Sequence, residues 1–415
     1  MQKHEFIEPV RLYSAIRDFD YPFILESVEK AGNSRFTYVS FNPLYTVEID
    51  EDLRVDGEKV AKVNDVFEAL KRIHVKGLLV GYIAYDAVLS FVGKKVEEKS
   101  FFGCYDSYFV YDHYLGKLFS YNVENAEKIV EKAKKEEVGY GSGGASVVKR
   151  DEKEKFEKLV LKAKELIEEG EVYQLVLSRE YKLKSDFDPF EIYLRLRELN
   201  PSPYMFLLEF KKSLVGSSPE TMGRVEGRIF KINPIAGTAK RVEGKEEETI
   251  RRLLSDEKER AEHVMLVDLA RNDVRKVCKA GSVKVTRFMD AVVYPSVIHI
   301  ESEVIGELKA NATHFDAMKA SFPAGTVTGA PKRRAVELID ELETSRRGIY
   351  AGAVGYFSQN VSDLAIAIRM AEIEKLCRVR AGAGIVADSI PEREFFETES
   401  KMAKVLEAVG YDSRG

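Results

Sequence analysis

The sequence has few of the residues from which metal centres and disulfide frameworks are built. Its three cysteines, Cys104, Cys278 and Cys377, are scattered through 415 residues and are odd in number. This pattern argues for a reducing compartment, so we expect a cytoplasmic protein without a structural zinc site. The six histidines never form the HExxH motif that is typical of zinc peptidases.

Long apolar runs and basic runs are also missing. The longest apolar stretch, Leu78 to Val92, is interrupted by Asp86 and is shorter than the ~20 residues that span a bilayer. Residues 1–6 lack the apolar segment of a signal peptide. The net charge is −5, and no cluster of lysine and arginine follows a surface that could track a nucleic-acid backbone. We therefore expect no membrane and no nucleic acid among the partners.

Glutamine is scarce, with three residues, whereas lysine and glutamate are abundant. This composition is typical of proteins from organisms that grow at high temperature. With 45% hydrophobic and 32% charged residues, the chain has the composition of a globular protein with a sizeable core.

The order of the expected elements indicates an α+β fold. Segments rich in aromatic and β-branched residues, such as 77–92 and 101–121, predict strands. Amphipathic patterns predict long helices at 151–169 and 255–280. Strands and helices do not alternate regularly, which argues against a parallel βαβ sheet.

A glycine- and serine-rich stretch predicts one boundary in the chain. Residues 139–150 have the composition of a linker. They would separate an N-terminal region, 1–138, from a catalytic region, 151–415.

Near the C-terminus, glycines precede charged residues that share one helix face. Gly382 and Gly384 would let the backbone approach a ligand closely. Glu394, Glu397 and Lys401 follow at i, i+3 and i+7. This group could hold a metal ion beside an anion, or it could be a solvated face with Glu–Lys pairs, and its spacing alone favours the solvated face.

A second acidic pair, Glu259 and Glu262, lies on the expected helix 255–280. Two such pairs are a plausible cage for Mg²⁺, which prefers oxygen ligands. Because Lys258 and Arg260 surround them, these glutamates taken alone could also be ordinary surface residues.

Two further side chains lie on the polar faces of expected strands. His299 faces away from its isoleucine neighbours, so it could be a general acid or base, or equally a surface histidine. Arg369 alternates in the same way, which suits either carboxylate recognition or a structural ion pair.

Several long motifs, in order between about Phe156 and Val409, together resemble the chorismate-utilising enzymes, and most closely the large subunits of anthranilate synthases. The N-terminal Ile24–Ser27 and Asn200–Met205 segments are similar to elements of the same family. The main motifs are GEVYQLVLS (170–178), GSSPE (216–220), PIAGT (234–238), ERAEHVMLVDLARND (259–273), FPAGTVTGAP (322–331), GAVGY (352–356) and the stretch 381–401.

The resemblance implies a fold of two packed antiparallel β-sheets flanked by helices, with a helical lobe that docks a partner. It also implies a Mg²⁺ ion bound by Glu262 and Glu397, with Glu259 and Glu394 as direct or water-mediated ligands. The ion would hold the ring carboxylate of chorismate. The substrate-binding residues that it implies are Tyr350, Arg369, Gly382, Gly384, Lys401, Ala236, Gly237 and Thr238, and the catalytic residues are His299, Glu220, Gln174 and Thr326.

Two positions distinguish the chemistries of the family. Members that add water to the ring have a lysine base where this chain has Gln174. Members that make 4-amino-4-deoxychorismate have a nucleophilic lysine where this chain has Ala236. Both substitutions match anthranilate synthase, in which ammonia attacks C2, the C4 hydroxyl leaves with a proton from Glu220, and pyruvate is then lost while His299 handles the ring proton. The usual arginine before PIAGT is Asn233 here, which puts the role of that arginine in doubt.

The resemblance further implies a hetero-oligomer and feedback inhibition. No cysteine lies in a GxCxGxQ setting, so a separate glutamine amidotransferase subunit would supply the ammonia. Tryptophan would be the inhibitor, bound by Glu26 and Ser27 beside Pro203, Tyr204 and Met205. The alternatives are a 4-amino-4-deoxychorismate synthase, which Ala236 argues against, and a non-catalytic paralogue that only binds tryptophan or a partner, which the retained site residues argue against.

Overall fold

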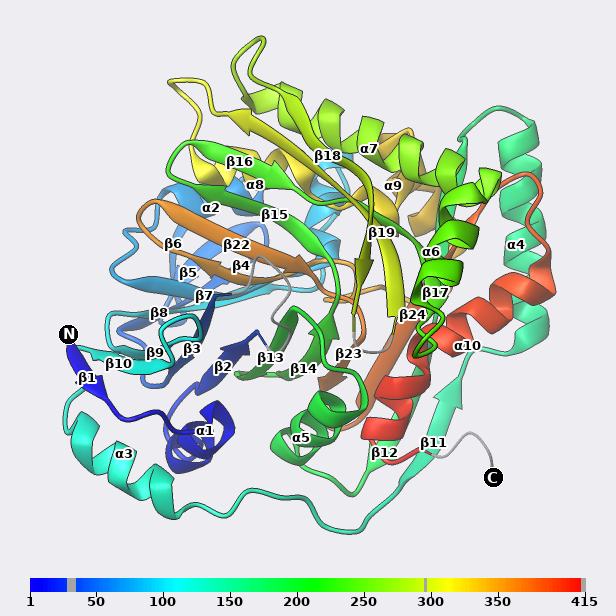
Figure 1. The fold of residues 1–415 in the computed structure, drawn as a ribbon. Helices are drawn as coiled ribbons and strands as arrows, with labels where there is room; N and C mark the ends of the chain where they lie inside the picture. Colours follow the sequence, from blue (N-terminus) through cyan, green and yellow to red (C-terminus); the bar gives the residue numbers. More distant parts are fainter. Residues whose placement is uncertain (28–34, 295–296, 412–415) are drawn as a thin grey trace.

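The computed structural model describes residues 1–27, 35–294 and 297–411. Its strands form two large sheets whose neighbouring strands are antiparallel, and helices flank both sheets (Figure 1). This is the α+β architecture that the sequence predicted. Apolar side chains from both sheets, among them Phe23, Phe206, Val80 and Val354, form one buried cluster and so constitute the core between the sheets.

The first sheet contains strands from both ends of the chain. In spatial order they are β1 (Gln2–His4), β10 (Lys117–Tyr121), β9 (Tyr108–Asp112), β3 (Phe36–Ser40), β2 (Phe23–Glu26), β13 (Tyr204–Glu209), β14 (Ser213–Ser218), β23 (Met370–Ile373), β24 (Cys377–Ile385), β12 (Gln174–Ser185) and β11 (Ala145–Arg150), with β20 (Gly329–Ala330) also paired to β12.

The second sheet is built in the same mixed way. Its order is β17 (Ile235–Lys240), β19 (Val297–Glu307), β16 (Ile229–Ile232), β15 (Thr221–Glu226), β22 (Val361–Ile366), β21 (Ala353–Phe357), β7 (Leu78–Ile83), β8 (Ser100–Tyr105), β4 (Tyr45–Ile49), β5 (Asp52–Val55) and β6 (Glu58–Lys62), with β18 (Lys284–Val293) paired to β19.

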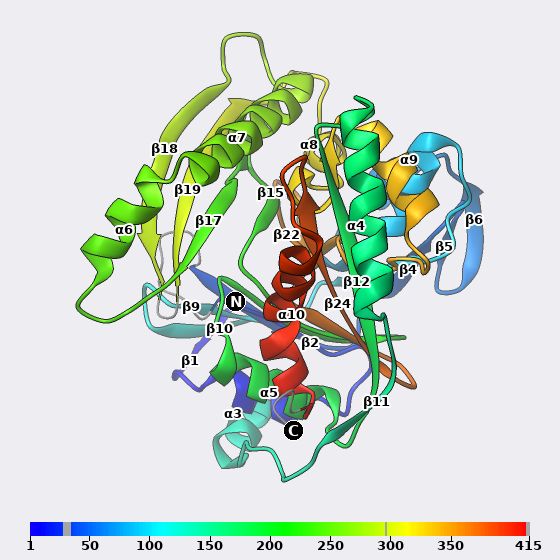
Figure 2. The ribbon, with the colours of Figure 1, turned by 90° about the vertical axis from the view of Figure 1, so that its right-hand side faces the viewer.

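The helices cover the outer faces of the sheets, where their apolar sides join four further core clusters (Figures 1 and 2). They are α1 (Pro9–Ile16), α2 (Val66–Lys71), α3 (Ala126–Lys135), α4 (Lys153–Glu168), α5 (Pro189–Leu199), α6 (Glu246–Ser255), α7 (Glu257–Val277), α8 (His314–Ser321), α9 (Lys332–Leu342) and α10 (Pro391–Ala408), with short 3₁₀ helices η1 (Tyr85–Val92) and η2 (Gly325–Val327). No helix in the described ranges is long and apolar enough to cross a bilayer. The lobe for partner docking stays a prediction.

The N-terminal region contributes strands to both sheets. Strand β2 pairs with β13, and β7 pairs with β21, so residues 1–138 supply central strands to each sheet. The expected linker is also only partly a linker. Residues 145–150 form β11, which pairs with β12, and Ala145 N–H donates to the carbonyl of Gly410 at 2.9 Å. The glycine and serine content of 139–144 hid the strand that follows it.

The strand predicted for residues 77–92 is too long. β7 ends at Ile83, and Tyr85–Val92 forms the helix η1, which ends at Gly93 in the left-handed region with φ of 72°. A continuous apolar run cannot distinguish a buried strand from a buried helical segment. The residue that interrupts the run, Asp86, lies in the first turn of η1 and is buried.

Candidate active site

The C-terminal stretch that the sequence singled out consists of β24, a short turn and α10. The Ser389 hydroxyl accepts the N–H of Val386 at 3.1 Å and closes the turn, and Pro391 occupies the first position of α10. This arrangement brings the α10 face beside the glycines of β24. Lys401 Nζ donates to the carbonyl of Gly382 at 3.0 Å and pairs with Glu397 at 2.5 Å.

Small residues on β24 leave room for two of the predicted side chains. A Cβ atom added at Gly382 would lie 3.2 Å from the hydroxyl of Tyr350. One added at Gly384 would lie 2.7 Å from Nε2 of Gln174, closer than real contacts allow. The two glycines therefore let Tyr350 and Gln174 lie against the backbone of the strand.

Arg369 completes the cationic side of the site. Its guanidinium donates to the main-chain carbonyl of Lys401, and its own backbone adopts a φ of 52°, which is uncommon for a residue with a side chain. Burial lowers the pKa of Arg369, while Tyr350 and Glu397 act to raise it. Arginine nevertheless stays charged at any physiological pH, so Arg369 and Lys401 place two cations near Tyr350. Such a pair suits a ligand with two carboxylates.

Glu220 and Thr326 meet from different parts of the chain. Thr326 Oγ1 donates to Glu220 Oε1 at 2.9 Å. Burial raises the pKa of Glu220 to about 7, although the Thr326 hydrogen bond and the charge of Lys401 act to lower it. A carboxyl group with this pKa holds a proton in part of the molecules at neutral pH and can donate it to a leaving hydroxyl.

His299 lies on β19 and is 9% exposed, which excludes a surface histidine. A bulge in the pairing of β17 with β19 sits at Gly237, whose φ is 66°. Burial lowers the pKa of His299 to about 4, and the positive charge of Arg369 acts in the same direction. The imidazole is therefore neutral at pH 7 and able to accept a proton.

The four glutamates predicted to bind Mg²⁺ lie on two helices, Glu259 and Glu262 on α7 and Glu394 and Glu397 on α10. The Glu259 carboxylate approaches Gly237, because a Cβ there would lie 3.2 Å from Oε2. Over the described ranges, no three His, Cys, Asp or Glu side chains gather closely enough to hold a metal. Four carboxylates have the oxygen chemistry that Mg²⁺ prefers, but the magnesium site stays a prediction.

All but the first residue of the PIAGT segment lies in β17. Ala236 is buried opposite Ile300, while the side chain of Thr238 falls outside what the structure describes. Asn233, which replaces the usual arginine, is buried, and its Nδ2 donates to Glu301 Oε1 at 3.0 Å. In this chain the residue at position 233 therefore makes a structural hydrogen bond.

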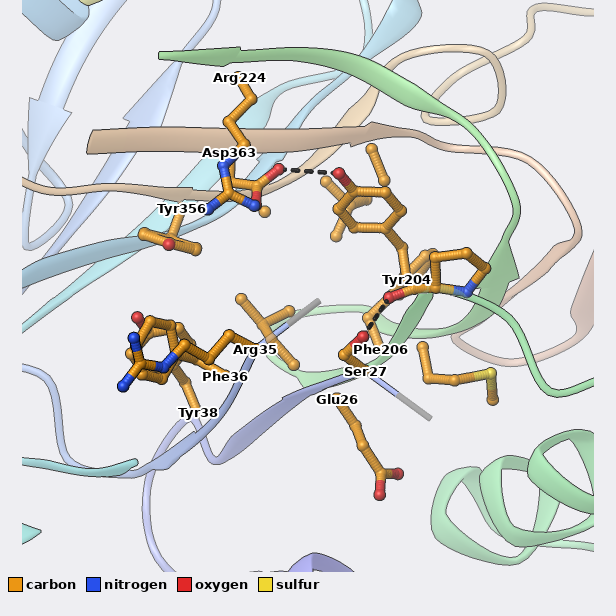
Figure 3. Close-up of a pocket in the computed structure, with 16 residues that line it drawn as sticks. Glu26, Ser27, Arg35, Phe36, Tyr38, Tyr204, Phe206, Arg224, Tyr356 and Asp363 are labelled. Atoms are coloured by element: carbon orange, nitrogen blue, oxygen red, sulfur yellow. Dashed lines mark hydrogen bonds and ion pairs between the residues drawn. The ribbon is translucent and has the colours of Figure 1, made fainter. Parts of the chain in front are cut away.

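The residues predicted for tryptophan binding line one pocket between the two sheets (Figure 3). Met205 pairs with Glu26 across β13 and β2, and Ser27 Oγ donates to the carbonyl of Pro203 at 3.1 Å. The hydroxyl of Tyr204 donates to Asp363 Oδ1 at 3.0 Å. Pairing of β2 with β13 thus brings together segments that are far apart in the sequence.

The predicted role of Glu26 does not fit this conformation. Its carboxylate points away from the pocket in Figure 3 and accepts hydrogen bonds from Arg197 and from the hydroxyl of Tyr193. The pocket instead has charged residues that sequence analysis missed, Arg35, Arg224 and Asp363. Asp363 and Arg224 lie on neighbouring strands, β22 and β15, whose alternation gave no sign that these side chains would face β13.

Replacing Glu220 with glutamine tests its burial. The folded-state pKa of Glu220, about 7, lies above its ordinary value of 4.5, so ionisation opposes folding as the pH rises from about 4.5 to about 7. Gln cannot ionise. The free energy of unfolding of Glu220→Gln minus that of the unchanged protein should therefore be larger at pH 8 than at pH 5, by on the order of 2 kcal/mol. Urea unfolding at both pH values measures this, and a difference independent of pH would contradict it.

Comparison with known proteins identifies the family of the chain. Residues 21–407 match the model of the chorismate binding enzyme family. Anthranilate synthase component 1 of Archaeoglobus fulgidus is 70% identical to this chain over 410 residues, which cover 99% of this chain and 100% of the relative. The component 1 of Thermococcus kodakarensis is 55% identical over 428 residues, which cover 99% of each chain. The crystal structure of anthranilate synthase component I from Streptococcus pneumoniae has a TM-score of 0.77 at 32% identity, covering 92% of this chain and 94% of that one. The chain therefore belongs to the family of chorismate binding enzymes.

Proposed function

We propose that the chain is the chorismate-converting component of an anthranilate synthase. It would form anthranilate and pyruvate from chorismate and ammonia, the first step of tryptophan biosynthesis. The observation that carries this is the chemistry at two positions: Gln174 lies against Gly384, and Ala236 is buried on β17. Neither side chain can act as a base or a nucleophile, and neutral ammonia needs neither. The names of the 70% and 55% identical relatives support the same reaction.

Arg369, Lys401 and the hydroxyl of Tyr350 would hold the carboxylates of chorismate. Ammonia then forms a bond to C2 while both ring double bonds shift and the C4 hydroxyl leaves as water with the proton of Glu220. The ammonium group formed at C2 loses one proton and becomes the amine. In the second step His299 takes the proton from C2, the C2–C3 double bond forms as the C3–oxygen bond breaks, and the released enolate gains one proton on carbon to become pyruvate. The pKa values of Glu220 and His299 suit these roles, because one group holds its proton near neutral pH and the other is free to accept one.

Glu262 and Glu397, assisted by Glu259 and Glu394, would hold Mg²⁺. When bound, the ion neutralises the ring carboxylate of the substrate and orients it. Lys401 pairs with Glu397 and would hold a substrate carboxylate beside the ion that Glu397 binds.

An assay with chorismate, Mg²⁺ and ammonium tests the reaction, with the product identified by fluorescence and mass. His299→Ala should lose about 100-fold or more in turnover, because removal of a general base costs roughly that much. His74→Ala, at an exposed position, is the matched control and should keep full turnover. Unchanged turnover in His299→Ala would remove the histidine from the mechanism. A 4-amino product would indicate 4-amino-4-deoxychorismate synthase, and no turnover with Mg²⁺ would indicate the non-catalytic paralogue.

We also propose a hetero-oligomer in which a glutamine amidotransferase subunit supplies the ammonia. The three cysteines are buried, and none lies in the nucleophile setting of a glutaminase. Glutamine should therefore support anthranilate formation only after that subunit is added, whereas ammonium supports it in the chain alone. Measuring both nitrogen sources with and without the subunit checks this, and glutamine-dependent turnover by the isolated chain would refute it.

The pocket of Figure 3 is proposed as the site of feedback inhibition by tryptophan. Its apolar and aromatic lining suits an indole ring, and Asp363 offers a carboxylate for an amino group. The pocket is also tied to the active site, because the Tyr204 hydroxyl lies 2.6 Å from Thr221 Oγ1, next to Glu220 in the chain. A bound ligand that moves Tyr204 would therefore disturb the acid.

Tryptophan should raise the melting temperature and inhibit chorismate turnover, since a ligand at 100 times its Kd stabilises the folded state by about 2.7 kcal/mol. Ser27→Ala removes the hydrogen bond to Pro203 and should weaken inhibition about tenfold without loss of uninhibited turnover. Ser14→Ala removes a hydroxyl that donates to Glu136 at the end of α3 and does not line the pocket, so it should leave inhibition unchanged. If tryptophan alters neither the melting temperature nor the chorismate kinetics, the regulatory role is excluded.

A further inference from the structure

An arginine side chain lies inside the apolar layer between β12 and α10. Arg179 is 1% exposed and is among the largest fully buried side chains of the protein. Leu177, on the same face of β12, belongs to the core cluster against which Phe395 of α10 packs. Tyr181, also on this face, belongs to the cluster that contains Met402 of α10. A leucine or methionine would fill such a layer, so packing alone does not account for the arginine.

The guanidinium of Arg179 holds one turn of α10 through three contacts. Its Nε donates to Thr398 Oγ1 at 2.6 Å, and its Nη2 forms an ion pair with Glu399. Its central carbon lies 4.1 Å from the ring centre of Phe395, a cation–π contact. The Thr398 hydroxyl in turn donates to the carbonyl of Phe395 at 2.7 Å. These contacts surround Glu397, which lies in the same turn of the helix.

The neighbouring face of this turn belongs to the candidate site. Glu397 and Lys401 form an ion pair there, and Lys401 also donates to the carbonyl of Gly382 at 3.0 Å. Arg179 pairs across the sheet with Ala381, the residue before Gly382. Apolar contacts are non-directional and define the rotation of a helix about its axis only loosely, whereas hydrogen bonds are directional. The bonds of Arg179 are therefore suited to fix the direction in which Glu397 and Lys401 point.

We propose that Arg179 is a positioning residue, which fixes the rotation of α10 so that Glu397 and Lys401 meet the substrate and its metal ion. The inference rests on the proposed function, because that function assigns Glu397 and Lys401 their roles. Arg179 lies on the face of β12 opposite to that of Gln174, so it acts through the helix.

The stability of the fold depends on Arg179 less than the site does. Replacing a buried charged group by an apolar residue of similar volume is often neutral for stability. Glu399 is 26% exposed, so water can solvate its carboxylate when the arginine is removed. Thr398 keeps its hydrogen bond to the carbonyl of Phe395. Loss of the guanidinium should therefore change ligand binding while the fold persists.

Arg179→Met in the full chain tests the inference by two measurements. The first is the Mg²⁺ concentration that gives half-maximal anthranilate formation with ammonium. It should rise about tenfold, the loss typical when a group that orients a metal ligand is removed. The second is the gain in the free energy of unfolding in urea that Mg²⁺ and chorismate produce together, without ammonium and hence without turnover. This gain should fall by about 1.4 kcal/mol, the equivalent of tenfold weaker binding.

Arg195→Met is the matched control. The Arg195 guanidinium donates to the carbonyls of Glu407 and Ala408 at 2.8 Å each, at the other end of α10. This variant should leave both measurements unchanged, which separates the positioning of Glu397 from the general attachment of the helix. An equal effect of Arg195→Met would overturn the inference.

The remaining outcomes distinguish the inference from the proposed function. If the unchanged protein responds to Mg²⁺ and chorismate while Arg179→Met responds equally, the inference is overturned and the proposed function stands. If Arg179→Met does not fold, Arg179→Lys decides alone, because lysine keeps the charge but lacks the fork that binds two partners at once. It should shift both measurements in the same direction, and unchanged values would overturn the inference. If the unchanged protein forms no anthranilate with Mg²⁺ and ammonium, the proposed function and this inference fail together.

Discussion

A buried ion pair between Arg347 and Glu343 is the interaction on which the arrangement of the site depends. Their side chains are 1% and 3% exposed, and their charged groups lie 2.7 Å apart. Arg347 bonds the main chain of β12 and of the loop that carries Thr326, while Glu343 accepts both the N–H and the hydroxyl of Ser178. Removing one partner of such a pair costs roughly 3–5 kcal/mol, because a charge is left buried without compensation. The pair therefore fixes the end of α9 against β12, and with it the wall that Tyr350 shares.

Both sheets contribute residues to the candidate site. Sheet one supplies Gln174 from β12 and the glycines from β24, whereas sheet two supplies His299 and Ala236. Glu220 lies in the chain between β14 of the first sheet and β15 of the second, so its position depends on both sheets. Because the Tyr204 hydroxyl contacts Thr221 and Asp363 of the second sheet, a change in the packing of the sheets reaches Glu220 through one short segment.

The sequence predicted the parts of the site that depend on local spacing. Helix periodicity placed Glu397 and Lys401 on one face, and their ion pair confirms this. The roles of Glu220 and His299, which the resemblance implies, stay predictions. Properties that depend on long-range packing could not be predicted from the sequence. No local pattern indicates that Glu26 would be neutralised by Arg197, that Asp363 would reach the pocket of Figure 3, or that Asp86 would be buried. The strand prediction for residues 77–92 was wrong at η1 for the same reason. A helical segment and a strand that are buried on all sides have the same continuous apolar sequence.

Burial has opposite effects on the two groups that exchange protons in the proposed reaction. It raises the pKa of Glu220 and lowers that of His299, so both groups favour their uncharged forms near neutral pH. A protonated acid and a neutral base can each act on an intermediate without first exchanging protons with water. Gln174 and Ala236 add no charge beside them. In the proposed reaction Arg369 and Lys401 would bind the carboxylates of the substrate, Lys401 in place of its present pairing with Glu397. The nucleophile in that reaction is neutral ammonia, which already carries its lone pair and therefore needs no base beside C2.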